Sequence, residues 1–167
     1  LSTLHTNSAA GAIPRLIDMG AEPFLLTSTI NVIIAQRLVR KLSDSKEAYK
    51  LTEAELKDLE GYVNLDLVLE ALKKEKIVEK NVTWKTVEFF KPRKTSTTAD
   101  GYGGRLGIYE IFGVSTAIQK LINERATSDE INTQARGEGM LTMVEDGIFK
   151  AVQGLTSIEE VFRVANN

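Results

Sequence analysis

The chain has 167 residues, of which 43% are hydrophobic and 26% are charged, and its formal net charge is −2. This composition is typical of a globular chain with enough residues for a real core, and the balanced charges give no reason to expect a nucleic-acid-binding surface. The absence of cysteine and the presence of a single histidine exclude disulfides, thiolate zinc sites and histidine-rich metal sites.

The sequence contains no apolar run long enough to span a membrane and does not begin with a signal-peptide pattern. We therefore expect a cytoplasmic location. Because the first residue is not methionine, we also expect the chain to be a fragment of a longer protein.

The first segment, residues 1–7, carries the only histidine, His5, among hydroxyl and amide side chains. If this segment is a strand, Thr3 and His5 lie on one face and Thr6 on the other. Polar groups where a strand gives way to a helix are well placed to meet a phosphate or a second subunit. On these residues alone, a histidine held in an ordinary turn is the simpler interpretation.

A helix is predicted next, over residues 8–19, with Asn7 or Ser8 as its N-cap and Gly20 as its stop. Pro14 is awkward in such a helix. It would lie past the first turn, where its missing N–H could cost about 3 kcal/mol or kink the segment.

Residues 24–35 are apolar almost throughout. Their number favours a buried helix, although the β-branched residues among them would also suit a strand. Residues 36–42 end this apolar region with three cations, Arg37, Arg40 and Lys41. We prefer a strand here.

The composition then shifts towards Lys, Glu and Leu, and a capping-box pattern joins Thr52 to Glu55. A second helix is indicated by apolar residues at helical spacing, Leu65, Val68, Leu69 and Leu72. Residues 82–90 have the Thr, Trp, Val and Phe content of a strand, and residues 91–100 read as a loop. We expect residues 43–100 to form a small inserted subdomain.

Residues 101–110, GYGGRLGIYE, are rich in glycine. They do not match a phosphate-cradling loop, because Leu106 stands where G-x-G-x-x-G needs glycine and the Gly-Lys-Ser/Thr of a P-loop is absent. A tight turn that leads into a strand over residues 106–112 is the physical interpretation.

The last third of the chain is predicted to be helical. Three further capping-box patterns begin at Thr127, Thr142 and Thr156. Gly139 and Gly154 fall between the apolar stripes as stops. Three or four short helices packed as a bundle follow from this pattern.

Several segments, taken together and in order, resemble one known family. STLHTN, RLIDMG and EPF, within residues 2–24, look like the histidine-box region of the type II secretion and type IV pilus assembly ATPases. QRLVR at 36–40 is similar to the segment that follows in that family, and residues 101–110 resemble its downstream strand. EGM, EDG and GLTSIEEV, within residues 138–161, resemble its C-terminal helices. Only residues 43–100 are loosely matched.

The resemblance implies an α/β fold, with the C-terminal portion of a RecA-like P-loop ATPase core over residues 1–42 and a returning strand over 101–113. Residues 43–100 would be the inserted helical subdomain and residues 114–167 a C-terminal helical bundle. It also implies a hexameric, Mg²⁺-dependent ATPase at the cytoplasmic face of the inner membrane. Its partners would be the inner-membrane platform and secretion or pilus assembly proteins, with no direct contact to nucleic acid.

The Walker A and Walker B motifs of that family are absent from these residues and would lie upstream. The chain alone should therefore not hydrolyse ATP. By resemblance, His5 is the box histidine that contacts the γ-phosphate, flanked by Thr3 and Thr6, because developing phosphoryl charge needs positioned donors. Arg37 and Arg40 are candidates for contacts at the subunit interface. Ion pairs at the edge of a sheet are an equally open interpretation of both residues.

Many relatives carry a four-cysteine zinc module between the Gln-Arg-Leu segment and the Gly-Tyr turn. Because hydroxyls cannot replace thiolates at a structural zinc, we expect no zinc here. The subdomain would instead be held by its Leu-rich helices and by Trp84, Phe89 and Phe90. A different class of protein also stays open: a free-standing helical interaction module without nucleotide chemistry.

Overall fold

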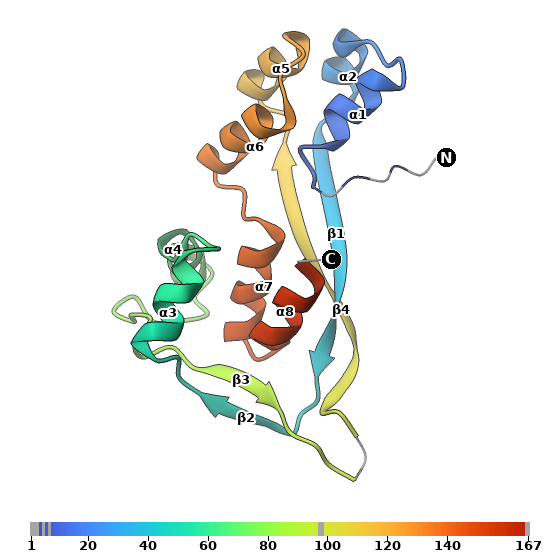
Figure 1. The fold of residues 1–167 in the computed structure, drawn as a ribbon. Coiled ribbons are helices and arrows are strands. Elements are labelled where there is room, and N and C mark those ends of the chain that lie inside the picture. The colour runs from blue at the N-terminus through green and yellow to red at the C-terminus, as the bar shows by residue number, and fades with distance from the viewer. Residues whose placement is uncertain (1–3, 5, 7, 97–98, 166–167) are drawn as a thin grey trace. The chain divides into compact units, whose positions relative to one another are not determined.

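The structure is a computed structural model that describes residues 4, 6, 8–96 and 99–165 (Figure 1). In this part of the chain it has a mixed α/β architecture of eight helices and four strands. The chain divides into two compact units. Unit 1 comprises the described residues of 1–35 and 110–140, and unit 2 those of 36–109 and 141–167.

The strands form two small sheets of two strands each. In one, β1 (Val32–Leu42) pairs with β4 (Tyr102–Gly113), and both strands contribute residues to each unit. In the other, β2 (Lys46–Tyr49) pairs antiparallel with β3 (Phe89–Pro92). The register sets Lys46 opposite Pro92 and Tyr49 opposite Phe89.

The strand predicted over residues 106–112 is confirmed, since it forms part of β4.

Unit 1 packs four helices around an apolar core. They are α1 (Ala12–Asp18), α2 (Pro23–Thr29), α5 (Thr116–Asn123) and α6 (Ser128–Gly137). The side chains at its centre are fully buried or nearly so: Ile13, Leu26, Phe112, Ile118, Ile122 and Ile131. Each helix of this unit has only two or three turns, so burial of one apolar face rather than helix propensity stabilises it.

The first helix begins later than the sequence predicts. It starts at Ala12, not at residue 8, so Pro14 is its third residue. The first N–H groups of a helix have no intrahelical acceptor, and a proline there removes no hydrogen bond. The backbone N–H of Arg15, the next residue, donates to the Gly11 carbonyl at 3.4 Å. At this position Pro14 therefore costs the helix no hydrogen bond.

The apolar run 24–35 is divided between two elements, since α2 ends at Thr29 and β1 begins at Val32. The expected buried helix over the whole run is wrong. Several of its large side chains are exposed, among them Phe24 at 63% and Ile34 at 57%.

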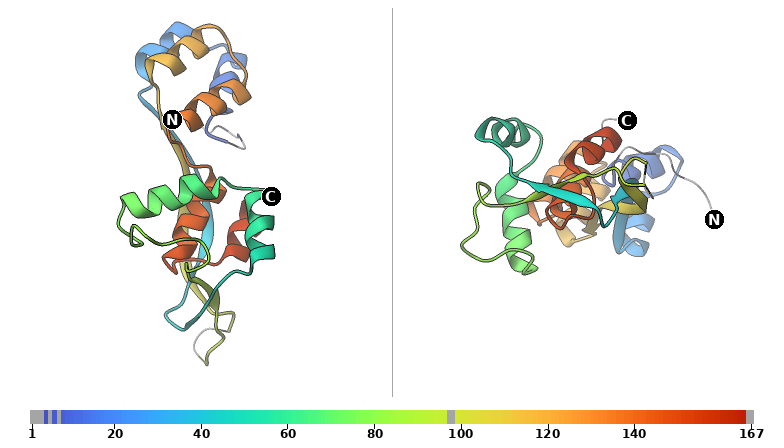
Figure 2. Two further views of the ribbon diagram at one scale, coloured as in Figure 1. Left: turned by 90° about the vertical axis from the view of Figure 1, so that its left-hand side faces the viewer. Right: turned by 90° about the horizontal axis from the view of Figure 1, so that it is seen from below.

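Unit 2 packs α3 (Glu53–Glu60), α4 (Leu65–Lys74), α7 (Met143–Val152) and α8 (Ile158–Ala165) together with β2 and β3. Its core contains Leu56 and Leu59 of α3, Leu65 and Leu72 of α4, Phe89 of β3 and Ile148 of α7. The ring of Trp84 stacks on Phe89 with centroids 6.2 Å apart. Figure 2 shows these elements from two further directions.

The strand expected over residues 82–90 lies later, at Phe89–Pro92. Residues 83–87 form hydrogen-bonded turns instead, and the indole N–H of Trp84 donates to the Leu65 carbonyl at 3.1 Å. Val87 is buried in the same core. The large side chains here therefore reflect packing inside unit 2 and not an extended backbone.

Three of the four capping boxes are confirmed, at Thr52, Thr127 and Thr142. The fourth does not form, and a simple N-cap hydrogen bond one residue later takes its place. The Ser157 hydroxyl accepts the Glu160 backbone N–H at 3.2 Å, while the Thr156 hydroxyl donates to the Arg40 carbonyl at 2.8 Å. A tertiary contact has therefore taken the side chain that the local pattern assigned to the cap.

Gly147 allows α7 and α8 to approach closely. A Cβ at this position would overlap Val161, a fully buried residue of α8. We expect Gly147→Ala to lower the free energy of unfolding by about 1–2 kcal/mol, because overpacking outweighs the gain in helix propensity. Chemical denaturation followed by circular dichroism measures the change.

Gly137→Ala is the matched control, since a Cβ there meets nothing within 4 Å. It should leave stability unchanged or raise it slightly. Equal behaviour of the two variants would show that the Gly147 contact does not limit packing.

Candidate functional site

The N-terminal site predicted from the sequence is only partly described. Thr3 and His5 lie outside the described residues, whereas Thr6 is half-buried in unit 1. Thr6 lines a mainly polar cavity of about 380 Å³ together with Ser8, Gly11, Pro14, Arg15, Asp18 and Ser128. The polar end of the first segment therefore borders a hollow formed by α1 and the start of α6.

A buried carboxylate fixes the chain just after this segment. Oε2 of Glu110, in β4, accepts the backbone N–H of Ala9 at 2.9 Å. Both residues are at least nine-tenths buried. Hydrogen bonds to charged acceptors in such surroundings are among the stronger ones. Glu110, which the sequence did not single out as a site residue, thus fixes the backbone at Ala9, shortly after the histidine in the sequence.

The guanidinium of Arg40 is held by two carboxylates and an aromatic ring of unit 2. Its Nε and Nη2 donate to Oε2 of Glu160 at 3.0 and 2.8 Å, and its Nη1 donates to Asp100 at 3.2 Å. The guanidinium carbon lies 4.1 Å from the centroid of Tyr102. The backbone N–H of Arg40 also donates to Glu160, at 2.9 Å. These contacts correspond to the ion-pair interpretation of this arginine.

Glu160 is the centre of the cluster. Its side chain is fully buried and also accepts hydrogen bonds from Arg163, one turn along α8. Burial alone would raise the pKa of this carboxyl, but the hydrogen bonds from Arg163 and Arg40 outweigh it and lower the pKa to about 2. Glu160 is therefore ionised at neutral pH, and the charge ties β1 to α8.

Arg37 also reaches α8, where its Nη1 donates to the Val164 carbonyl at 2.8 Å. The two predicted arginines thus contact one helix of unit 2, and Thr6 belongs to unit 1.

Another ion pair in unit 2 was missed by sequence reasoning. Lys150 of α7 pairs with Asp146 one turn earlier and donates to the Gly107 carbonyl at 2.8 Å. Asp146 accepts the backbone N–H of Tyr109 at 2.8 Å. The i, i+4 spacing of Asp146 and Lys150 is a signal that the sequence contained. The pair joins α7 to β4.

The described residues contain neither a metal-binding cluster nor a membrane-spanning helix. No group of three or more His, Cys, Asp or Glu side chains there could hold a metal ion. In the same part of the chain, no helix combines the length and apolar character that crossing a bilayer requires.

Comparison with known proteins gives a consistent result. The family model described as "Type II/IV secretion system protein" matches residues 1–163. The chain is 41% identical over 167 residues to the type II secretion system protein E of Xanthomonas campestris pv. campestris, covering all of this chain and 27% of that protein. It is 39% identical over 168 residues to the type IV pilus assembly ATPase PilB of Pseudomonas aeruginosa, covering all of this chain and 26% of that protein.

The type II secretion system ATPase E of Vibrio cholerae is 37% identical over 165 residues, which cover 98% of this chain and 29% of that protein. The chain therefore spans about a quarter of the length of these relatives. The match confirms the resemblance seen in the sequence, and the chain belongs to the type II/IV secretion system protein family.

Proposed function

We propose that this chain is the C-terminal part of a motor ATPase that couples ATP hydrolysis to type II protein secretion or type IV pilus assembly. One observation carries the proposal: the similarity runs along the whole chain to proteins named as secretion or pilus assembly ATPases. The working protein would be a hexamer, cytoplasmic and peripheral to the inner membrane, with the platform and the other assembly proteins of that membrane as its partners.

In this proposal, residues 1–42 are a portion of a RecA-like core. The exposed apolar side chains of α2 and β1 support it, among them Phe24, Leu25, Val32 and Ile34. Large apolar side chains gathered on neighbouring elements usually mark a surface that another part of the assembly covers. The rest of the core and the neighbouring subunit of a ring would supply that cover.

The nucleotide site would be shared between this chain and residues outside it. His5 would donate a hydrogen bond from its imidazole to the γ-phosphate, and Thr3 and Thr6 would hold the segment in register beside it. The half-buried position of Thr6 and the anchor at Glu110 support a fixed origin for this segment. Arg37 stays the proposed interface arginine, whereas the contacts of Arg40 favour a role in holding α8.

Mg²⁺ would neutralise phosphate charge when ATP is bound. In this proposal its protein ligands, like the Walker A loop, would come from outside this chain.

We expect the complete protein to release phosphate from Mg·ATP and the purified chain of residues 1–167 to release none. The physical reason is that these residues contain no P-loop to position the phosphates. A colorimetric phosphate assay on both proteins measures it. Hydrolysis by the isolated chain would contradict the proposed division of the site, and an upstream reading frame without G-x-x-x-x-G-K-[ST] would favour the interaction-module alternative.

A further inference from the structure

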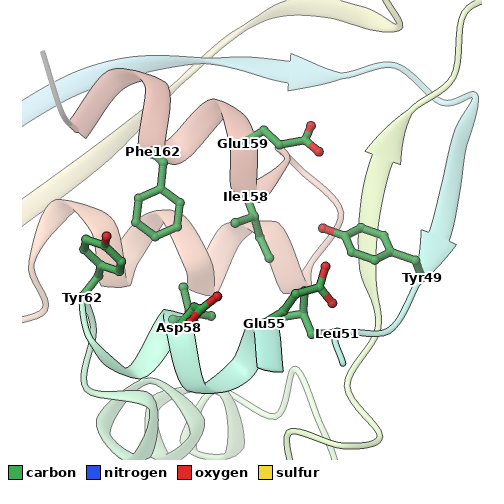
Figure 3. A pocket seen from close by; sticks show the side chains of 9 residues that line it. Tyr49, Leu51, Glu55, Asp58, Tyr62, Ile158, Glu159 and Phe162 are labelled. Carbon is green, nitrogen blue, oxygen red and sulfur yellow. The ribbon is translucent and has the colours of Figure 1, made fainter. Parts of the chain in front are cut away.

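Unit 2 contains an apolar groove between α3 and α8 (Figure 3). The groove encloses about 240 Å³. Its floor is formed by Leu51, Leu59, Ile158 and Phe162. Figure 3 shows Tyr49 at one end and Tyr62 beside Phe162 at the other. Ligand pockets for small molecules usually measure about 300–1,000 Å³, so this groove fits one large apolar side chain better than a whole ligand.

The rim of this groove is acidic. Glu55, Asp58 and Glu159 contribute carboxylates, and no Lys, Arg or His is among the lining residues that the structure describes. Asp58 and Glu159 form no ion pair with any described residue. Burial raises the pKa of Tyr49 to about 12, and the negative charges of Glu159 and Glu55 add to the effect. The groove therefore has a negative potential above an apolar floor.

Tyr62 is the exposed aromatic residue of the groove. It is 70% exposed, and its ring meets Phe162 edge-to-face with centroids 5.4 Å apart. Tyrosine at the margin of an apolar groove is a frequent anchor of protein–protein contacts, because it buries a large ring and keeps a polar tip.

We propose that this groove binds a basic amphipathic segment of a partner protein. One Leu- or Phe-sized side chain of that segment enters the cavity against Ile158 and Phe162, and flanking Lys or Arg side chains pair with Asp58 and Glu159. The charge of the rim selects the partner, since an acidic segment with the same apolar residues would be repelled. This inference goes beyond the nucleotide chemistry proposed above and does not depend on it.

A labelled peptide tests the proposal directly. The probe is a fluorescein-labelled amphipathic peptide with leucines at helical spacing and lysines at the other positions, and its control carries glutamates in place of the lysines. We expect the full 167-residue chain to bind the basic peptide in a fluorescence anisotropy titration, more weakly as salt is raised, and not to bind the acidic one. Binding of both peptides with equal affinity, or of neither, would overturn the proposal.

Variants locate the binding. The double variant Asp58→Asn with Glu159→Gln should lower the affinity for the basic peptide about fivefold, and Tyr62→Ser should lower it about tenfold. The matched control, Glu70→Gln with Glu79→Gln, removes the same charge at exposed positions outside the groove and should change nothing. Equal weakening by the control pair would show non-specific attraction and contradict the site.

Sedimentation equilibrium of the chain without peptide tests whether a second copy of the chain occupies the groove instead. We expect no self-association that depends on Tyr62. Association of wild-type chains that is lost in Tyr62→Ser would assign the groove to a second copy and overturn the proposal.

Discussion

The variant His5→Ala of the complete protein is expected to hydrolyse ATP about a hundredfold more slowly than the wild type. The expectation follows from the proposed role of His5 as a donor to the γ-phosphate, where negative charge develops during transfer. A donor that acts mainly in the transition state lowers kcat when it is removed and changes KM little. Steady-state phosphate release over a range of ATP concentrations separates the two constants.

Two further variants make this result specific. His5→Gln keeps an N–H donor and should recover part of the lost rate, whereas Lys74→Ala, at an exposed position of α4, should hydrolyse ATP as the wild type does. Unchanged turnover in His5→Ala would show that His5 does not contact the γ-phosphate.

Glu160→Gln should destabilise the chain by about 3 kcal/mol at pH 7. The estimate comes from the difference between the ordinary value of 4.5 and the pKa of about 2 in the folded chain. Glutamine preserves the volume but cannot compensate the two guanidinium charges of Arg40 and Arg163. Chemical denaturation at pH 7 measures the loss, and Glu159→Gln, the exposed neighbour on α8, is the control that should leave stability unchanged.

The same variant has a defined pH dependence. Because the pKa of Glu160 is lower in the folded chain than in the unfolded one, its contribution is fully present above about pH 4.5 and is lost as the pH falls towards 2. The gap in unfolding free energy between wild type and Glu160→Gln should therefore close progressively over that range. A gap that stays constant down to pH 3 would show that the ion pairs do not stabilise the fold.

Elements specified by neighbouring residues were predictable from the sequence. The capping boxes at Thr52, Thr127 and Thr142 formed as expected, because the hydroxyl, the carboxylate and the helix start lie within four residues of one another. At Thr156 the same pattern failed, since its hydroxyl donates to Arg40, a residue far away in the sequence. Local patterns predict well where no tertiary partner competes for the side chain.

Predictions from composition were weaker. Trp84 and Val87 suggested a strand by their type, yet they fill a core from a turn. Phe24 and Ile34 suggested burial by their apolar character, yet both side chains are exposed. In both cases the side chain's environment depends on what packs beside it, and residue type alone does not fix that environment.

For the candidate site, sequence reasoning reached His5 through family resemblance and not through chemistry visible in the segment. It missed the partners that organise Arg40, because Glu160 lies in a helix at the other end of the chain. Ion pairs between distant segments leave no periodic signal in a single sequence.

The way the two units alternate along the sequence has a consequence for synthesis. Unit 1 uses residues on both sides of the first part of unit 2, and unit 2 is completed only by α7 and α8. Neither core can therefore close as its first residues leave the ribosome. Unit 1 must wait for α5 and α6 and unit 2 for α7 and α8, so the segments made before these helices lack part of their core until the helices emerge.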